Sequence, residues 1–340
     1  MTISTAKAFS PEAAIVGAGL SGLTCARELA KAGLVVNVFD KGRRPGGRMS
    51  TRGLDRDLSF DHGCQYFSAD APGFMTEVDA WVEAGVVSIW KGHVVEWRQG
   101  DFTENPMTRP RYVGTPGMAS ICGHLATGLN VRSDVEVFEV RRLDNKWHLL
   151  DEAGDLIGRS DALIVATPPG QVRKLVTHSA LLATATENVR MSPCWTVMMA
   201  FNERVDFPSD GAILHDSPLC WFARNSSKPM RSQSHDCWVV QASADWSAEH
   251  IEAEKHSVAT RIADQFRGLV GSSLKPVHLS AHRWRYATPT QPLDSGCVFD
   301  DTLNIGLCGD WCLGNRVEAA FLSGTAAADR LLQLMANGRL

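Results

Sequence analysis

The sequence predicts an α/β protein in which a discontinuous Rossmann-type domain carries a second domain with a mainly antiparallel β-sheet. Three observations indicate this. A glycine-rich turn at residues 17–22 joins an apolar strand to a helix, and apolar strands recur at 162–166 and 303–308. Residues 190–280 instead consist of short alternating strands, a pattern typical of antiparallel sheets. The two ends of the chain should therefore complete one sheet, and the middle should form another.

The turn has the form Gly-x-Gly-x-x-Gly and predicts a dinucleotide site. Gly17 permits a tight turn after strand 13–16, Gly19 permits close approach of a pyrophosphate, and Gly22 permits close packing of the helix. The amino end of that helix offers free N–H groups to phosphates. Strand 34–39 ends in Asp40, where an acid can accept a ribose hydroxyl. The alternative is a glycine-rich turn in an ordinary α/β fold.

Two loops follow that should lie near the nucleotide. Residues 41–50 contain proline, glycine and several cations, and Arg48 is the predicted phosphate partner because a guanidinium binds phosphate with two hydrogen bonds. The alternative is a solvated basic turn. Residues 60–67 mix glycine with polar and aromatic side chains, which suits a backbone that passes close to a flat ring.

The remaining periodicity places helices at 72–84, 118–125, 247–269 and 316–335, with a polar loop at 101–111. The strand at 162–166 is apolar throughout, which predicts a central position in a parallel sheet. We assign residues 1–70, 106–188 and 284–340 to the nucleotide-binding domain. Residues 71–105 and 189–283 are assigned to a substrate domain.

The far end of the chain favours FAD over NAD. Strand 303–308 leads into Gly309 and Asp310 and then into a helix, so a second strand–glycine–acid–helix element is present. Asp310 is placed to bind ribityl hydroxyls, and the amino end of the helix is placed to face the pyrimidine edge of a flavin.

The Gly-Gly-Arg loop at 46–48 and the terminal Gly309-Asp310 resemble the amine-oxidase branch of the flavoproteins. Four segments resemble the bacterial renalase family within that branch, namely 112–118, 216–229, 281–287 and 308–313. The resemblance covers essentially the whole chain. It implies a two-domain fold like that of p-hydroxybenzoate hydroxylase, with non-covalent FAD. It also implies oxidation of the 2- and 6-dihydro isomers of NAD(P) to NAD(P)⁺, with O2 reduced to hydrogen peroxide.

The resemblance, with the motif positions around it, implies a set of cofactor contacts. These are Gly17, Gly19, Leu20, Ser21, Gly22, Asp40, Lys41, Gly47, Arg48, Met49, Gln65, Tyr66, Val135, Thr167, Gly309, Asp310, Val317, Glu318 and Ala319.

Hydride transfer to a flavin needs no acid, base or nucleophile from the protein, so the substrate site should be aromatic and dry. The residues predicted to act there are Gln65, His282, Trp284 and Trp311, and each has the alternative of an ordinary core residue. Arg224 and Asn225 have two alternatives, a phosphate anchor or a solvated turn.

Two other functions stay open at this point. One is an amine oxidase in the strict sense, which usually has a lysine near the flavin; Lys255 and Lys275 are the lysines of residues 230–290, and neither is convincing. The other is a flavin-binding module without catalysis.

Composition excludes several classes. The formal net charge is -4 and no basic run is present, so nucleic acid is not an expected partner. The nine cysteines show no pairing pattern and no zinc spacing, which predicts a reducing, cytoplasmic location and no metal site. No apolar run is long enough to span a bilayer or to form a signal peptide, so no membrane association is expected.

Overall fold

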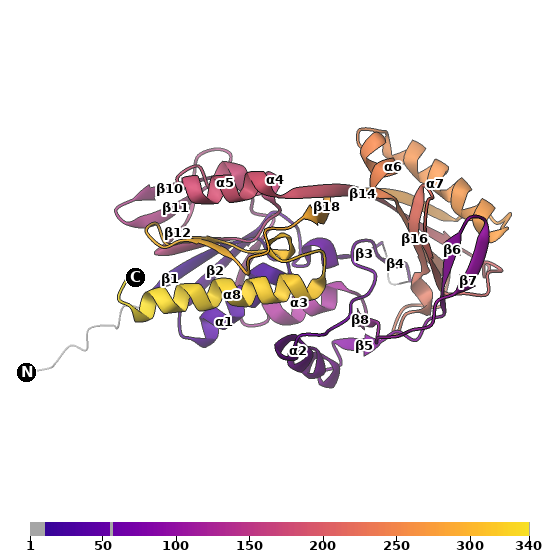
Figure 1. The fold of residues 1–340 in the computed structure, drawn as a ribbon, viewed down its shortest axis with the longest axis horizontal. Helices are drawn as coiled ribbons and strands as arrows, with labels where there is room; N and C mark the ends of the chain where they lie inside the picture. Colours follow the sequence, from indigo (N-terminus) through magenta and orange to yellow (C-terminus); the bar gives the residue numbers. More distant parts are fainter. Residues whose placement is uncertain (1–10, 55–56, 340) are drawn as a thin grey trace, which may run out of the picture.

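The molecule is elongated, and each of its two lobes contains one large β-sheet with helices against it (Figure 1). The structure is a computed structural model that describes residues 11–54 and 57–339. The predicted α/β class with two kinds of sheet is confirmed.

The first lobe contains a six-stranded sheet in the order β19-β20-β13-β1-β2-β9, parallel except for β19. Strand β13 lies inside the sheet between β20 and β1 and all its residues are buried, as its apolar sequence predicts. The strands are β1 (Glu12–Val16), β2 (Val35–Asp40), β9 (Asn130–Ser133), β13 (Ala162–Val165), β19 (Val298–Asp300) and β20 (Ile305–Leu307).

Both faces of this sheet are covered. Ala13 and Ile15 of β1 pack in one hydrophobic core and Ala14 and Val16 in another, because successive side chains of a strand point to opposite faces. One face carries α1 (Leu20–Lys31), α3 (Ala119–Ala126) and α8 (Val317–Ala336); the other carries α4 (Pro169–Val172), α5 (Ala180–Asn188) and the sheet of β10 (Glu139–Leu143), β11 (Lys146–Leu150) and β12 (Leu156–Ser160) (Figure 1).

Helices α1 and α8 lie side by side, and a glycine sets their separation (Figure 1). A Cβ atom on Gly324 would lie 2.3 Å from the Ser21 carbonyl oxygen, so only glycine fits there. The face of α8 that contains Gly324 is therefore the surface that packs on α1.

The second lobe contains a seven-stranded sheet in the order β18-β14-β17-β16-β15-β6-β7, antiparallel except for the β15–β6 pair. Its strands are β6 (Val94–Arg98), β7 (Asp101–Glu104), β14 (Arg190–Phe201), β15 (Gly211–Leu214), β16 (Leu219–Arg224), β17 (Asp236–Ala242) and β18 (His278–Gln291). The predicted loop at 101–111 is wrong over residues 101–104, which pair with β6.

Two helices, α6 (Ala244–Glu249) and α7 (Lys255–Val270), pack on this sheet. The prediction of one continuous helix over 247–269 is wrong, because the chain leaves helical geometry at His250 and the next helix begins at Lys255, after the extended residue Glu254. The Glu254 side chain accepts a hydrogen bond from the Ser257 N–H and so caps α7. Glutamate is not among the preferred capping residues, so no pattern in the sequence marks this start.

The long strands β14 and β18 extend from one lobe to the other (Figure 1). Strand β18 crosses the boundary predicted between residues 283 and 284. Helix α2 (Pro72–Glu83), assigned from the sequence to the substrate domain, packs through Phe74 and Trp81 in the core of the first lobe. Two short sheets complete the fold, β3 (Thr51–Gly53) with β4 (Ser59–Asp61) and β5 (Val87–Ile89) with β8 (Tyr112–Gly114).

Candidate active site

A cavity of about 1750 Å³ lies between the two lobes and contains most of the predicted site residues in its lining. Its walls come from the carboxyl ends of β1, β2 and β13, the loops at 41–53 and 62–66, strands β14 and β18, and the segment 309–317. Ligands of open parallel sheets bind beyond the carboxyl ends of the strands, which is where this cavity begins.

The glycine turn forms one end of the cavity. Gly17 has φ of +112°, so it adopts a conformation that other residues rarely take. A Cβ on Gly22 would lie 2.1 Å from the Gly17 carbonyl oxygen, so this glycine is required for helix packing and does not itself line the cavity. A Cβ on Gly19 would meet no atom within 4 Å, so the cavity side of this residue is open.

Asp40 closes this end. One carboxylate oxygen accepts a hydrogen bond from the Ala18 N–H at 2.5 Å and the other from the Gly42 N–H at 2.6 Å. These bonds fix the carboxylate beside the glycine turn, and each oxygen keeps a lone pair for a further donor.

Arg48 and Asp310 join the early loop to the C-terminal segment. Nη1 of Arg48 donates to Asp310 Oδ2 at 2.7 Å, and Nη2 donates to Oδ1 at 2.5 Å. Nη1 also donates to the Ala287 carbonyl at 3.0 Å. The guanidinium therefore uses its fork on a protein carboxylate, although both side chains line the cavity.

Three rings form an aromatic group on the β18 side of the cavity. The rings of His62 and Trp284 stack with centroids 5.1 Å apart, and the ring of His282 meets Trp284 edge-on at 4.3 Å. Burial lowers the pKa of His62 to about 4, with repulsion from Arg52 in the same direction. Burial, His62 and Arg52 lower the pKa of His282 to about 3. Both imidazoles are therefore neutral at pH 7 and form an uncharged surface.

Most predicted residues meet in this one cavity. Those that line it are Gly17, Gly19, Leu20, Ser21, Asp40, Lys41, Gly47, Arg48, Met49, Gln65, Tyr66, Val135, Thr167, His282, Trp284, Gly309, Asp310 and Val317.

Besides Gly22, three predicted residues lie outside the cavity lining, namely Trp311, Glu318 and Ala319. Trp311 is fully buried in the core on the far face of the sheet, where its indole N–H donates to the Thr167 carbonyl. The Glu318 carboxylate accepts hydrogen bonds from the N–H groups of Asp70 and Ala71 and so caps α2. Ala319 is buried outside the cavity lining.

Arg224 and Asn225 are neither a phosphate anchor nor a solvated turn. Both are 1% exposed and lie outside the cavity lining. Arg224 donates hydrogen bonds to the Asp236 carboxylate at 2.6 Å and to the backbone carbonyls of Val205 and Phe207. It therefore links the end of β16 to the start of β17 and to the loop at 205–207.

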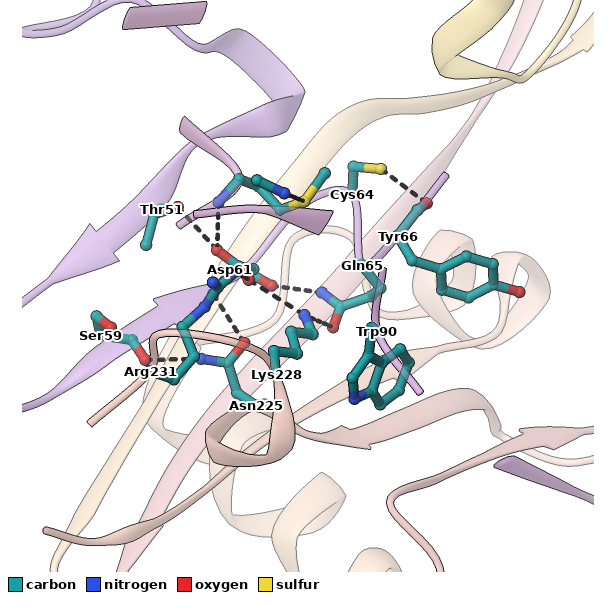
Figure 2. Close-up of polar contacts among 12 residues, drawn as sticks. Thr51, Ser59, Asp61, Cys64, Gln65, Tyr66, Trp90, Asn225, Lys228 and Arg231 are labelled. Atoms are coloured by element: carbon teal, nitrogen blue, oxygen red, sulfur yellow. Dashed lines mark hydrogen bonds and ion pairs between the residues drawn. The ribbon is translucent and has the colours of Figure 1, made fainter. Parts of the chain in front are cut away.

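Sequence reasoning missed a buried charge cluster behind the cavity wall (Figure 2). Lys228 and Arg231 both contact the Asp61 carboxylate, from residues more than 160 positions away. Although burial alone would raise it, the pKa of Asp61 is held well below its usual value by the two cations. Burial lowers the pKa of Lys228, and the Asp61 carboxylate opposes this. Asp61 and Lys228 lie in segments that the sequence had singled out, 60–67 and 216–229, but nothing in either segment indicated that the two side chains meet.

Two buried polar atoms indicate that the cavity fits a bound molecule. Thr167 and Trp221 line it, and their atoms Oγ1 and Nε1 are buried with no hydrogen-bond partner among the described residues. Buried polar groups are rarely left unpaired, so a ligand is the natural partner. The open helix end at Gly19 and the large volume fit a dinucleotide together with a second molecule.

Among residues 11–54 and 57–339 no helix is long and apolar enough to cross a membrane. Within the same part of the chain, no group of histidine, cysteine and acidic side chains has the arrangement of a metal site.

Comparison with known proteins agrees with this geometry. The profile described as "Flavin containing amine oxidoreductase" matches residues 95–332, and that of an NAD(P)-binding Rossmann-like domain matches residues 15–78. Renalase of Mus musculus is 23% identical over 299 residues, which is 81% of this chain and 84% of the mouse protein.

Two solved structures share the fold across nearly the whole chain. One, from Exiguobacterium sp. 255-15 and assigned as a protoporphyrinogen oxidase, has a TM-score of 0.79 at 12% identity and covers 96% of this chain and 99% of its own. Cyclohexylamine oxidase from Brevibacterium oxydans IH-35A has a TM-score of 0.75 at 11% identity, over 96% and 100% of the two chains.

Proposed function

This chain belongs to the family of flavin containing amine oxidoreductases, and from that premise we propose that it oxidises the 2- and 6-dihydro isomers of NAD(P). It is a renalase-like, flavin-dependent oxidoreductase. In the proposed reaction the hydride at position 2 or 6 of the dihydropyridine ring would pass to the flavin and leave NAD(P)⁺. O2 would then take up the two electrons and the proton of that hydride, with one further proton from solvent, to give hydrogen peroxide.

One observation carries this choice of substrate, namely the positive charge of the part of the cavity that lies near the aromatic group of His62, His282 and Trp284. Arg52, Lys255, Arg283 and Arg285 line this part, whereas the described carboxylates of the lining, Asp40, Glu136 and Asp310, lie on other elements. A cationic wall attracts the pyrophosphate of a dinucleotide and repels a protonated amine.

The individual cations differ in how much of this charge they contribute. Arg283 and Arg285 share the exposed Glu252 carboxylate, which offsets part of their charge. Arg52 and Lys255 have no carboxylate partner among the described residues, and burial with repulsion from Arg43 lowers the pKa of Arg52. Arg52 and Lys255 are therefore the proposed phosphate-binding residues, in place of Arg224 and Asn225.

We assign the cofactor as non-covalent FAD. The turn at Gly19 with the N–H groups of α1 would hold its pyrophosphate, and Asp40 its ribose; the Arg48–Asp310 pair and the Thr167 hydroxyl lie along the remaining wall. When bound, the flavin supplies the hydride acceptor. Burial raises the pKa of Cys308 to about 12, so this thiol is a poor nucleophile, which supports non-covalent binding.

The protein's own part in the reaction is to orient the substrate ring and exclude water. Trp284 and the neutral imidazole of His282 provide an aromatic surface against which a flat ring stacks. No residue is required to take a proton, which agrees with the neutral histidines.

The amine-oxidase alternative is not favoured. Lys255 begins α7 and lines the cavity, so a lysine is present there, but it is one of the cations assigned above to phosphate. A flavin-binding module without catalysis is the third candidate. The nine free thiols support the expected cytoplasmic location, because cysteines stay reduced there.

Anaerobic titration of the purified flavoprotein separates these functions. Borohydride-reduced NAD contains the 2-, 4- and 6-dihydro isomers, and it should bleach the flavin in full, with peroxide formed when air is admitted. Monoamines and polyamines should leave the spectrum unchanged. Bleaching by amines and not by the dihydronicotinamides would overturn the proposal, and so would the absence of bleaching by either.

Variants test the cationic wall. Arg52→Gln and Lys255→Gln should each raise KM for the dihydronicotinamides about 10-fold or more, since each removes a charged hydrogen bond to phosphate. Lys275→Gln is the matched control, because Lys275 is exposed outside the cavity lining. Equal KM values for all three variants would contradict the phosphate-binding role.

A further inference from the structure

The buried charge cluster formed by Asp61, Lys228 and Arg231 has no role in the proposed reaction. Its three side chains are 0%, 0% and 1% exposed. Lys228 Nζ lies 3.2 Å from Asp61 Oδ2, and Arg231 Nη2 lies 2.6 Å from the same oxygen. Burying three charged groups costs desolvation free energy, and apolar side chains in the same place would not carry that cost. A contribution to folding stability is therefore a weak explanation for the presence of this cluster.

The cluster is anchored on the side of the first lobe. Asp61 Oδ1 accepts hydrogen bonds from the Thr51 hydroxyl at 2.8 Å and from the Met118 N–H at 2.9 Å. Asp61 therefore has a fixed position at the end of β4, and it fixes the ammonium group of Lys228 in turn (Figure 2).

Lys228 also contacts the cavity wall through one residue, Gln65. Lys228 Nζ donates to Gln65 Oε1 at 3.3 Å. An ammonium group only donates, so it selects the orientation of the amide in which the oxygen faces the cluster. The amide nitrogen then faces the other way and donates to the carbonyls of Asp61 and Gly63. Both donors of the Gln65 amide are thereby used within residues 61–65.

This segment, residues 61–65, is a wall of the cavity. His62, Gly63, Cys64 and Gln65 all line it. A Cβ on Gly63 would lie 2.0 Å from the Arg48 carbonyl oxygen, so the segment also packs directly on the loop at 46–50. A shift of the segment would displace both walls at once.

Two carbonyls of the segment also accept hydrogen bonds from strands β17 and β18 of the seven-stranded sheet. The Trp284 indole N–H donates to the His62 carbonyl at 2.8 Å, and Gln241 Nε2 donates to the Gly63 carbonyl at 2.8 Å. The position of Trp284, the proposed stacking surface, therefore depends on the same segment that Gln65 shapes.

We propose that Lys228 is a positioning residue, which orients the Gln65 amide and so holds residues 61–65 and Trp284 in the arrangement that flavin reduction requires. The inference rests on the proposed flavin chemistry but not on the identity of the reductant. Lys228 itself is fully buried and lies outside the cavity lining, so it acts through Gln65.

A double-mutant cycle of Lys228→Met and Gln65→Met tests this. Each single variant should alter the visible circular dichroism of the bound flavin and slow its reduction by borohydride-reduced NAD about 10- to 100-fold, as for a displaced reacting group, with little change in KM. Because both act through one amide, the double variant should be no slower than Gln65→Met alone. Additive slowing, or a Lys228→Met protein with wild-type spectrum and rate, would overturn the proposal.

Arg224→Met is the matched control, since Arg224 is an equally buried cation of the same region whose partners lie away from the cavity. It should lower the melting temperature and keep the wild-type spectrum and rate. If Arg224→Met alters the flavin spectrum in the same way as Lys228→Met, a general loss of stability explains the spectral change in both variants, and the proposal fails.

If Lys228→Met does not fold, Gln65→Glu replaces it. Glutamate can still accept from Lys228 but cannot donate to the carbonyls of Asp61 and Gly63, so its flavin spectrum should change as in Gln65→Met. A wild-type spectrum in both Gln65 variants would contradict the inference. The spectrum is recorded without substrate, so it remains decisive even if the reduced NAD mixture fails to bleach the wild-type flavin.

Discussion

Substitution of Gly19 by valine separates the cofactor site from the fold. Gly19 has φ of -79° and ψ of 177°, an extended conformation that valine adopts readily, and no atom lies within 4 Å of its Cβ position. Gly19 is the N-cap of α1, where valine is less favourable than glycine, so the flavin-free protein should lose no more than about 1 kcal/mol of unfolding free energy.

The effect on flavin binding should be far larger. The valine methyl groups would occupy the open space in front of the N–H groups of Leu20 and Ser21, where the pyrophosphate is expected. Loss of two hydrogen bonds to a charged group costs about 3–6 kcal/mol, which corresponds to a rise in the flavin Kd of about 10²- to 10⁴-fold. The protein should purify colourless, and fluorescence titration with FAD gives the Kd.

Gly22→Ala supplies the contrast within the same turn. Its Cβ would lie 2.1 Å from the Gly17 carbonyl oxygen, so the helix must move, at a cost of about 1–3 kcal/mol in urea unfolding of the flavin-free protein. A yellow Gly19→Val protein with a full complement of flavin would refute the placement of the pyrophosphate. Equal destabilisation by the two substitutions would refute the distinction between them.

Three further predictions concern charge. Asp61→Asn leaves two buried cations with reduced compensation and should lower the unfolding free energy by about 3–5 kcal/mol in urea titrations. Arg48→Lys loses at least one of the two bonds to Asp310 and should cost about 1–2 kcal/mol in the same measurement, a value reduced because the Arg48 side chain is 29% exposed. The pKa of His62 is lower in the folded protein than in the unfolded chain, so as the pH falls the unfolded chain binds a proton at this residue first. The unfolding free energy is therefore unaffected by His62 above about pH 6.5 and decreases as the pH falls toward 4. The slope is at most about 1.4 kcal/mol per pH unit. His62→Phe should flatten that slope.

Each of these has a result that contradicts it. An Asp61→Asn protein as stable as wild type would mean that the cluster is not balanced by this carboxylate. Wild-type stability of Arg48→Lys would mean that the two hydrogen bonds from the Arg48 guanidinium to Asp310 do not contribute to stability. Arg98→Lys is the control and should leave the stability unchanged, because the Arg98–Glu96 pair is exposed. An unchanged pH slope in His62→Phe would assign the slope to other groups.

Elements whose signals are local were predictable from the sequence. The turn at residues 17–22 and the acid at Asp40 lie within one strand–helix–strand unit, and β13 is apolar throughout. The break before Lys255 could not be predicted, because Glu254 is an unusual capping residue. The domain boundary at residue 284 could not be predicted either, because β18 runs through both lobes without interruption.

Site residues whose role depends on burial or on distant partners were the harder part. Trp311 follows Gly309 and Asp310 in the chain, yet its side chain enters the core on the far face, and sequence adjacency does not give that direction. Lys228 becomes part of the site only because the fold brings it to Asp61. No single-sequence pattern reports such a pairing over that separation.

The antiparallel pair of β14 and β18 has a consequence for the connection between the lobes. The two strands pair from Arg190 with Gln291 to Ala200 with His278, and the same strands supply part of the cavity wall. Because both strands run from one lobe to the other as a hydrogen-bonded pair, swinging the lobes apart would have to bend the two together. The pair therefore stiffens the connection between the lobes, and the residues of β14 and β18 that line the cavity keep their register relative to one another.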